Sequence, residues 1–262
     1  MKYQFLRNAF LSAVLIYKAT IPIFGQQTPL NMVQATVRKL RSNDGAVRAE
    51  AFEQLRSDPA NLKNQKVRAA LVNLLDRENR TLDAQLVEAQ KKGYPDNGDN
   101  AGWAEYYSDL FSTVDSFADW NDPRQACILV NAGSSDDSAF ASEVAHHAKV
   151  TIPCLMRKSE STVSMNRAIT VPILVQALAK ADSLDPGTAQ AVRQIVRDAL
   201  NDRDEGVRAF TVHALGEYGE EDMIPALRTV AETDSSSEVR GNSIKRAAAE
   251  AVTAIQKRAA QH

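Results

Sequence analysis

The sequence has few of the residues that build sheets and none of the short motifs that mark the commonest enzymes. Aromatic residues make up 6% of its 262 residues, and no stretch alternates apolar and polar positions for long enough to predict a strand. Gly-x-Ser-x-Gly, His-Glu-x-x-His and Gly-x-x-x-x-Gly-Lys are all missing, and scattered charges on helices usually form a solvated face. We therefore expect an all-α chain that is not an enzyme and has no catalytic or cofactor-binding residues.

Metal-binding patterns are missing as well. His146 and His147 are adjacent, so on a helix they point about 100° apart and do not share one ion easily. Glu143-x-x-His146 has the spacing of carboxylate-bridged iron sites, but no second copy accompanies it. The loop that begins at Asp96 has Tyr107 where a calcium loop needs its twelfth-position Glu. We expect no metal site.

The chain also lacks an excess of basic charge. It has 31 Lys and Arg against 33 Asp and Glu, a formal net charge of −2. If residues 1–25 are removed, as proposed below, 28 basic residues remain and the net charge becomes −5. A protein dedicated to phosphate backbones usually carries a basic stripe, so no nucleic-acid partner is expected.

Only two cysteines are present, Cys127 and Cys154. Two alternatives stay open for them. They form a disulfide, which an oxidising compartment permits and which would add roughly 3–4 kcal/mol in the chain-entropy model. Otherwise they are two buried thiols that act as small apolar residues.

What the sequence does contain is a helical phrase that recurs near the C-terminus. Asp202 precedes Val207-Arg208, and Asp234 precedes Val239-Arg240, so the phrase recurs after 32 residues. This period is typical of stacked helical hairpins. Apolar trios with the spacing of one helix face occur four times: Val47/Ala51/Leu55, Val67/Leu71/Leu75, Val192/Val196/Leu200 and Val207/Val212/Leu215.

The phrase resembles the HEAT repeat family, and the copy from Asp202 to Gly219 resembles the short bacterial HEAT-like repeats of the phycobilisome-lyase type. The resemblance is good over 200–258, fair over 44–76 and weak over 77–185. It implies an α-solenoid, a superhelical stack of HEAT-like helical hairpins. It also implies that Asp202 or Asp204, and Asp234, brace turns while Arg208 and Arg240 form a ladder between repeats. The alternative is an ordinary helical bundle.

We expect five segments: a secretion signal (1–25), N-terminal HEAT-like helices (28–92), a loop (93–102), irregular helical repeats (103–185) and C-terminal HEAT-like repeats (186–262). The loop is rich in Gly, Pro, Asn and Asp and is the best candidate boundary. The first helix expected after residue 43 ends at about 56. Further helices are expected over 64–76, 82–92, 103–117, 123–132, 137–150, 165–181, 187–200, 204–217, 221–232 and 238–259.

The first residues have the pattern of a secretory signal. Lys2 and Arg7 precede an apolar run over 9–17, and small residues precede a polar stretch. Cleavage is expected after Gly25 or, alternatively, after Ala19, so the protein would be exported to the periplasm or secreted. Lys18 interrupts the apolar stretch, so no stable membrane insertion is expected after signal removal. The alternative is an apolar helix packed on the first repeat.

Seven of the sixteen aromatic residues lie between 94 and 120. We expect the exposed members of this group to contact a partner, because Trp and Tyr combine a large rigid surface with a polar group. The residues proposed are Tyr94, Trp103, Tyr106 and Trp120. The alternative is that Trp103, Tyr107 and Phe111, which are four residues apart, are buried on one helix face.

Together these patterns predict a non-catalytic HEAT-repeat interaction module that binds a protein or peptide on its helical surface. The alternative is an enzyme or enzyme accessory protein of the bilin-lyase-like HEAT-repeat type. Sharing a repeat with those proteins does not by itself indicate sharing their activity.

Overall fold

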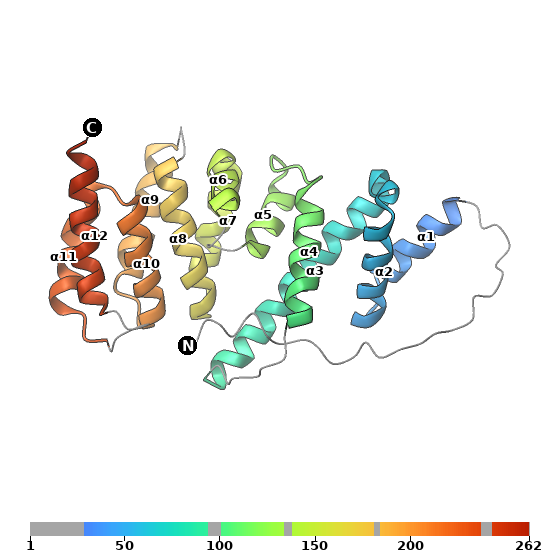
Figure 1. The fold of residues 1–262 in the computed structure, drawn as a ribbon, viewed down its shortest axis with the longest axis horizontal. Coiled ribbons are helices and arrows are strands. Elements are labelled where there is room, and N and C mark those ends of the chain that lie inside the picture. Colours follow the sequence, from blue (N-terminus) through green and yellow to red (C-terminus); the bar gives the residue numbers. More distant parts are fainter. Residues whose placement is uncertain (1–28, 94–100, 134–137, 181–183, 237–242, 262) are drawn as a thin grey trace. The chain divides into compact units, whose positions relative to one another are not determined.

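The computed structural model of the chain describes residues 29–93, 101–133, 138–180, 184–236 and 243–261. Within these ranges the chain forms twelve α-helices, two short 3-10 helices and no strand (Figure 1). The helices are α1 (Pro29–Leu40), α2 (Gly45–Ser57), η2 (Pro59–Lys63), α3 (Gln65–Lys91), α4 (Ala101–Asp115), α5 (Pro123–Ala132), α6 (Ser138–His146), α7 (Ala148–Ser159), α8 (Ser164–Lys180), α9 (Pro186–Ala199), α10 (Glu205–Tyr218), η3 (Glu221–Met223), α11 (Ile224–Thr233) and α12 (Ile244–Ala259).

The predicted fold class, an all-α solenoid of helical hairpins, is confirmed. The chain divides into two compact units, residues 1–118 and 119–262. The division falls after α4 and not within 93–102, because α4 packs on α3 and so belongs to the first unit. The expected signal at 1–25 lies outside the described residues.

Helix starts follow from side chains that replace missing backbone partners. The first N–H groups of a helix have no acceptor within it, and an Asp or Asn just before the helix supplies one, which stabilises it by about 1 kcal/mol. Asp122 and Asp185 do this ahead of Pro123 and Pro186, as the sequence predicts. The same role belongs to Asp44, Asp58, Asn64 and Asp204.

In the first unit, α3 is one continuous helix of 27 residues. The prediction of two helices, over 64–76 and 82–92, was wrong. Residues 77–81 contain neither Gly nor Pro, and two polar residues among them are buried with partners. Glu78 accepts a hydrogen bond from Arg48, and Asn79 accepts one from the Tyr107 hydroxyl. Because these groups are satisfied inside the protein, the helix continues through them.

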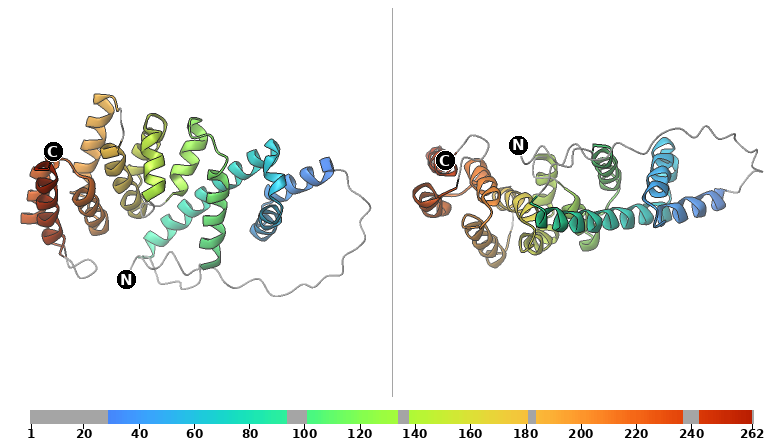
Figure 2. Two further views of the ribbon diagram at one scale, coloured as in Figure 1. Left: turned by 45° about the horizontal axis from the view of Figure 1, so that its top comes forward. Right: turned by 90° about the horizontal axis from the view of Figure 1, so that it is seen from below.

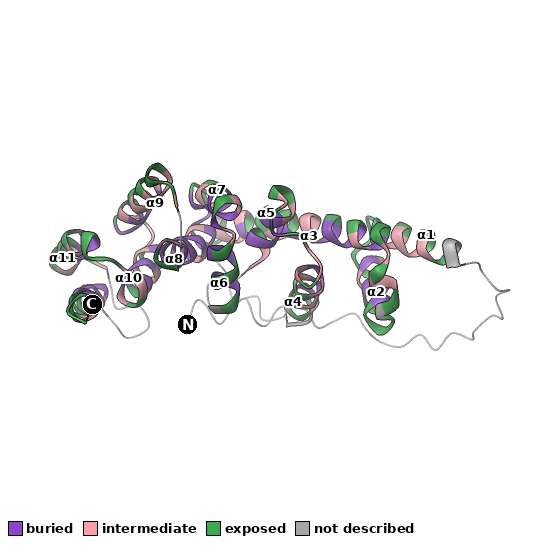
Figure 3. Ribbon diagram, turned by 90° about the horizontal axis from the view of Figure 1, so that it is seen from above, coloured by how far each residue is buried: buried purple, intermediate pink, exposed green. Residues whose placement is uncertain are grey.

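The second unit stacks its helices in two rows (Figure 3). One row contains α6, α8, α10 and α12, and the other contains α5, α7, α9 and α11. Neighbours within the first row pack on one another, and α8, α10 and α12 lie side by side in each view of Figure 2. Most residues at the contact between the rows are buried, so each helix covers the apolar stripe of its neighbours.

Helix α7 of the second unit was not predicted. A single helix was expected over 137–150, but α6 ends at His146 and α7 begins at Ala148. Pro153 lies inside α7 and is exposed. A proline inside a helix removes one backbone hydrogen bond, but the buried residues of α7, among them Ile152 and Leu155, hold it against α8.

Arginine side chains connect successive helices in a repeated geometry. Arg48, Arg68, Arg167 and Arg208 each donate to the backbone carbonyl of the residue six positions earlier, at 2.5–3.1 Å. Three of these arginines also bond a carboxylate that lies later in the chain. The pairs are Arg48 with Glu78, Arg167 with Asp202 and Arg208 with Asp234, at 2.6–2.9 Å. We call this set the arginine ladder.

The resemblance to HEAT repeats implied a ladder of arginines with Asp residues at the turns, and the structure contains one. It also shows which carboxylates three of these arginines bond. Arg208 pairs with Asp234 of the following hairpin, and Asp204 caps α10. Asp202 accepts a hydrogen bond from Arg167, a ladder residue that was not predicted from the sequence. Arg240 lies outside the described residues. In the second unit the ladder joins Arg167 of α8 to the turn between α9 and α10, and Arg208 of α10 to the residue that follows α11. In the first unit Arg48 of α2 bonds a carboxylate inside α3.

Two carboxylates of the ladder, Asp202 and Asp234, are held in their charged form. Burial alone would raise the pKa of Asp202 and of Asp234. Hydrogen bonds from the arginines and from nearby N–H and hydroxyl groups outweigh burial and lower the pKa of both below the usual 3.8.

Asp234→Asn is expected to lower the free energy of unfolding by about 1–3 kcal/mol at pH 7, because Arg208 loses its counter-charge in a site that is mostly buried. The pKa of Asp234 is lower in the folded than in the unfolded chain, so its stabilisation is complete above pH 3.8 and is lost as the pH falls further. The difference between wild type and variant should therefore shrink below pH 3.8 in urea titrations. Glu250→Gln, which alters an exposed ion pair, is the control and should change stability by less than about 0.5 kcal/mol. A difference that stays constant down to pH 2.5 would contradict the prediction.

Candidate functional site

The structure describes the side chains of two of the four predicted aromatic contact residues, Tyr106 and Trp120. Tyr94 lies outside the described residues, and so does the side chain of Trp103 at the start of α4. Tyr106 lies on α4 in the first unit, and Trp120 lies between α4 and α5 in the second.

Tyr106 is partly buried. Its ring lies edge-on to that of Phe52, with the centroids 5.7 Å apart. Its hydroxyl is buried and has no hydrogen-bond partner in the described part of the chain. Burial raises the pKa of this hydroxyl above its usual 10.0, and the Glu78 carboxylate adds to the rise. These contacts are those of a residue that packs α2 against α4.

Trp120 was expected to be exposed, and this was wrong. Its exposed fraction is 7%. The indole stacks on the His147 ring at a centroid distance of 5.9 Å and lies 6.1 Å from the Phe140 ring. Its position follows from the break between α6 and α7, which places His147 against it.

Cys127 on α5 and Cys154 on α7 form a disulfide in the structure, with their Cα atoms 5.5 Å apart. This is the first of the two alternatives that the sequence leaves open. Cys154 is buried and Cys127 is partly exposed. The bond joins α5 to the helix on which it packs.

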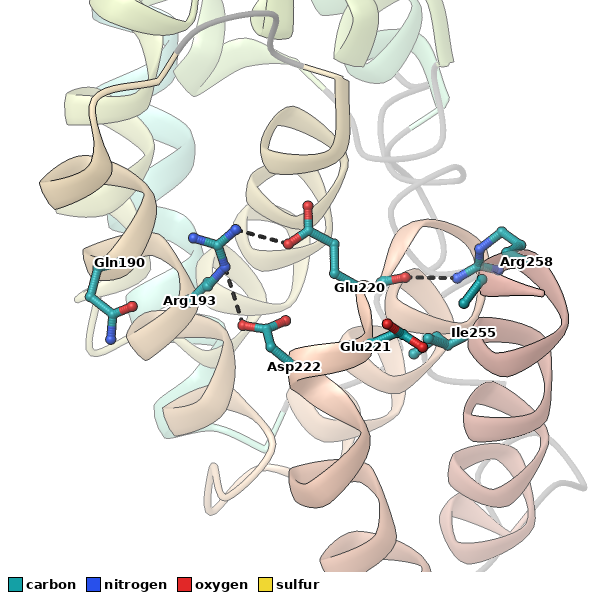
Figure 4. Close-up of a pocket in the computed structure, with 9 residues that line it drawn as sticks. Gln190, Arg193, Glu220, Glu221, Asp222, Ile255 and Arg258 are labelled. Atoms are coloured by element: carbon teal, nitrogen blue, oxygen red, sulfur yellow. Dashed lines mark hydrogen bonds and ion pairs between the residues drawn. The ribbon is translucent and has the colours of Figure 1, made fainter. Parts of the chain in front are cut away.

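The second unit contains an open cleft of about 630 Å³. We call it the α9–α12 cleft. It is bounded by α9, by the connection between α10 and α11, and by the end of α12 (Figure 4). The residues that line it are Gln190, Arg193, Gly219, Glu220, Glu221, Asp222, Ile255, Arg258 and Ala259.

Arg193 fixes one wall of the α9–α12 cleft. It bonds Glu220 at 2.8 Å and Asp222 at 3.2 Å, and so joins α9 to the connection after α10. The hydrogen bond to Glu220 is the main cause of a raised pKa at Arg193, and burial opposes it. Arg197, one turn later on α9, also bonds Asp222, at 3.1 Å.

Arg258 fixes the opposite wall. Its guanidinium donates to the carbonyl oxygens of Leu215, Gly216 and Gly219, at 3.4, 2.5 and 2.9 Å. These carbonyls lie at the C-terminal end of α10, where the helix dipole favours a cation. The Leu215 carbonyl also accepts a hydrogen bond from the Gly219 N–H. Arg258 therefore joins α12 to the end of α10.

The remaining polar groups of the cleft face solvent. Glu221 is exposed and forms no ion pair among the described residues. The cleft has three carboxylates and two guanidinium groups, so its charge is mixed with a small acidic excess. In the described ranges no group of three or more His, Cys, Asp or Glu is placed to hold a metal.

The α9–α12 cleft was not predicted from the sequence. Most of its lining residues fall in the stretch where the resemblance to the repeat is good, 200–258, whereas the partner contacts were expected in the earlier segment, at residues 94–120. The run Glu220-Glu221-Asp222 after Gly219 was the available signal, because three adjacent acidic residues at a turn need solvent or cations nearby.

Comparison with known proteins identifies the repeats. Residues 173–253 match the family described as HEAT repeats. This part of the chain, from α8 to α12, is therefore a HEAT-repeat array, and it contains most of the α9–α12 cleft. No curated protein and no solved structure matches the chain. The phycobilisome-lyase type stays a prediction. No helix in the described ranges is both long enough and apolar enough to cross a membrane.

Two glycines at the end of α10 make a matched pair for mutation. A Cβ at Gly219 would lie 2.5 Å from the Leu215 carbonyl oxygen and 3.1 Å from the Ile255 side chain, whereas one at Gly216 would lie 3.5 Å from Ala251. Gly219→Ala is expected to lower the free energy of unfolding by about 1–3 kcal/mol, because a backbone atom blocks the added methyl. Gly216→Ala lies within the helix and is expected to be neutral or to stabilise by up to about 1 kcal/mol. Urea unfolding of both variants tests this, and equal effects would contradict the packing described for Gly219.

Proposed function

We propose that the chain is a non-catalytic interaction module that binds a protein or peptide partner. Its HEAT-repeat array supports this, because HEAT repeats commonly mediate protein interactions. The observation that carries the proposal furthest is the α9–α12 cleft, which is open, lies in that array and has charged walls.

The way the cleft is built favours binding without large rearrangement. Arg193 and Arg258 already bond groups of the protein, so both walls are fixed before a partner arrives. A preformed surface has a lower entropic cost of association than one that must order on binding. Gln190 and Glu221 are the exposed polar side chains that remain for contact.

A photo-crosslinking amino acid placed at Gln190 or at Glu221 tests this proposal in cells of the source organism. Both positions are expected to form adducts with one polypeptide. The same amino acid at Lys149, exposed on α7 in the same unit, is the control and should not form them. Adducts at Lys149 alone, or at all three positions equally, would exclude the cleft as the binding surface. A bound small molecule that the purified protein converts would favour the enzyme alternative.

We also propose that the protein is exported and that residues 1–25 are its signal. The basic start and the short apolar run support this. A disulfide between Cys127 and Cys154 is compatible with it, because such bonds persist mainly in oxidising compartments.

N-terminal sequencing of the protein from fractionated cells tests the export proposal. The expected result is a chain that begins at residue 26, or at residue 20 for the alternative cleavage site, in the envelope or outside the cell. A chain that keeps its first residues and stays in the cytoplasm would refute export. That result would leave the binding proposal untouched.

A further inference from the structure

The disulfide between α5 and α7 lies beside a cation that bonds both of its sulfurs. The Arg157 guanidinium on α7 is 3.3 Å from the Cys154 sulfur and 3.4 Å from the Cys127 sulfur. Arg157 is exposed and forms no ion pair among the described residues. Its charge is therefore available to the sulfurs and is not neutralised by a carboxylate there.

The two sulfurs differ in how easily a reagent can approach them. Cys154 is 5% exposed, while Cys127 is partly exposed. A thiolate that cleaves a disulfide attacks one sulfur, and the other leaves with the electron pair. Access favours attack at Cys127, so that Cys154 is the leaving sulfur. Because Arg157 is three residues after Cys154 on the same helix, its guanidinium stays beside the departing sulfur as negative charge develops there.

We propose that this pair is a thiol-exchange site at which a low-molecular-weight thiol becomes attached to Cys127. The thiol first loses its proton to solvent. Its sulfur then forms a bond to the Cys127 sulfur while the Cys127–Cys154 bond breaks. The electron pair of the broken bond stays on Cys154 as a thiolate, which Arg157 stabilises. One disulfide is lost and one is formed, and the total charge does not change.

The physical basis is that a cation lowers the basicity of a nearby thiolate, and a less basic thiolate leaves faster. Arg157 therefore accelerates the opening of the bond. The product carries the small thiol on α5 and a free thiolate on α7, and the covalent link between these helices is gone.

The test uses the full chain in its oxidised form with reduced glutathione as the thiol. Iodoacetamide, added at intervals, alkylates the released cysteine and prevents the disulfide from closing again. Peptide mass spectrometry is expected to find glutathione on Cys127 and the alkyl group on Cys154. Glutathione mainly on Cys154, or no adduct on either cysteine, would overturn the proposal. This measurement needs no variant.

Three variants test the role of Arg157. Arg157→Gln is expected to slow adduct formation about 3- to 10-fold, and Arg157→Lys, which keeps the charge, should recover most of the rate. Lys158→Gln is the matched control. It removes the neighbouring cation on α7, which bonds the Asn131 carbonyl oxygen, and should leave the rate within about twofold of wild type. Equal rates for Arg157→Gln and Lys158→Gln would rule out a specific effect of Arg157. Far-UV circular dichroism confirms that each variant is folded before its rate is measured.

Discussion

The guanidinium groups of the arginine ladder are the interaction on which the hairpin stack depends. Each one bonds a carbonyl at the turn before its own helix, and three of them also bond a carboxylate of a later element. A turn exposes backbone groups that need partners, and a buried carboxylate needs a cation. One arginine side chain meets both needs. The relative position of successive hairpins is therefore set by charge and hydrogen bonding as well as by apolar packing.

Arginine side chains also join separate elements at the α9–α12 cleft. Arg193 and Arg258 already bond groups of the protein, and each joins two elements of the second unit. The charged side chains that form the walls of the cleft therefore stabilise the fold before any partner binds. This separates the residues that shape the cleft from the exposed ones, such as Glu221, that are available for contact.

The elements that local chemistry determines were predictable from the sequence. The starts at Asp122-Pro123 and Asp185-Pro186 are correct because capping and the fixed φ of proline act within a few residues. The continuity of α3 was missed because Glu78 and Asn79 are buried in it, and their polar groups are satisfied by the distant residues Arg48 and Tyr107. The burial of Trp120 depends in the same way on His147 and Phe140. The α9–α12 cleft is formed by residues up to 69 positions apart. A local sequence pattern does not predict that residues so far apart lie close together.

Arg167 reaches its carboxylate across 35 residues of sequence, and Arg208 reaches its own across 26. The bond is the same although the intervening length differs. The ladder thus fixes where a hairpin sits without fixing how many residues it contains, so that segments can be inserted or deleted between rungs while the register of the stack is kept. An array joined in this way can acquire new loops, and with them new surfaces, without rebuilding its frame.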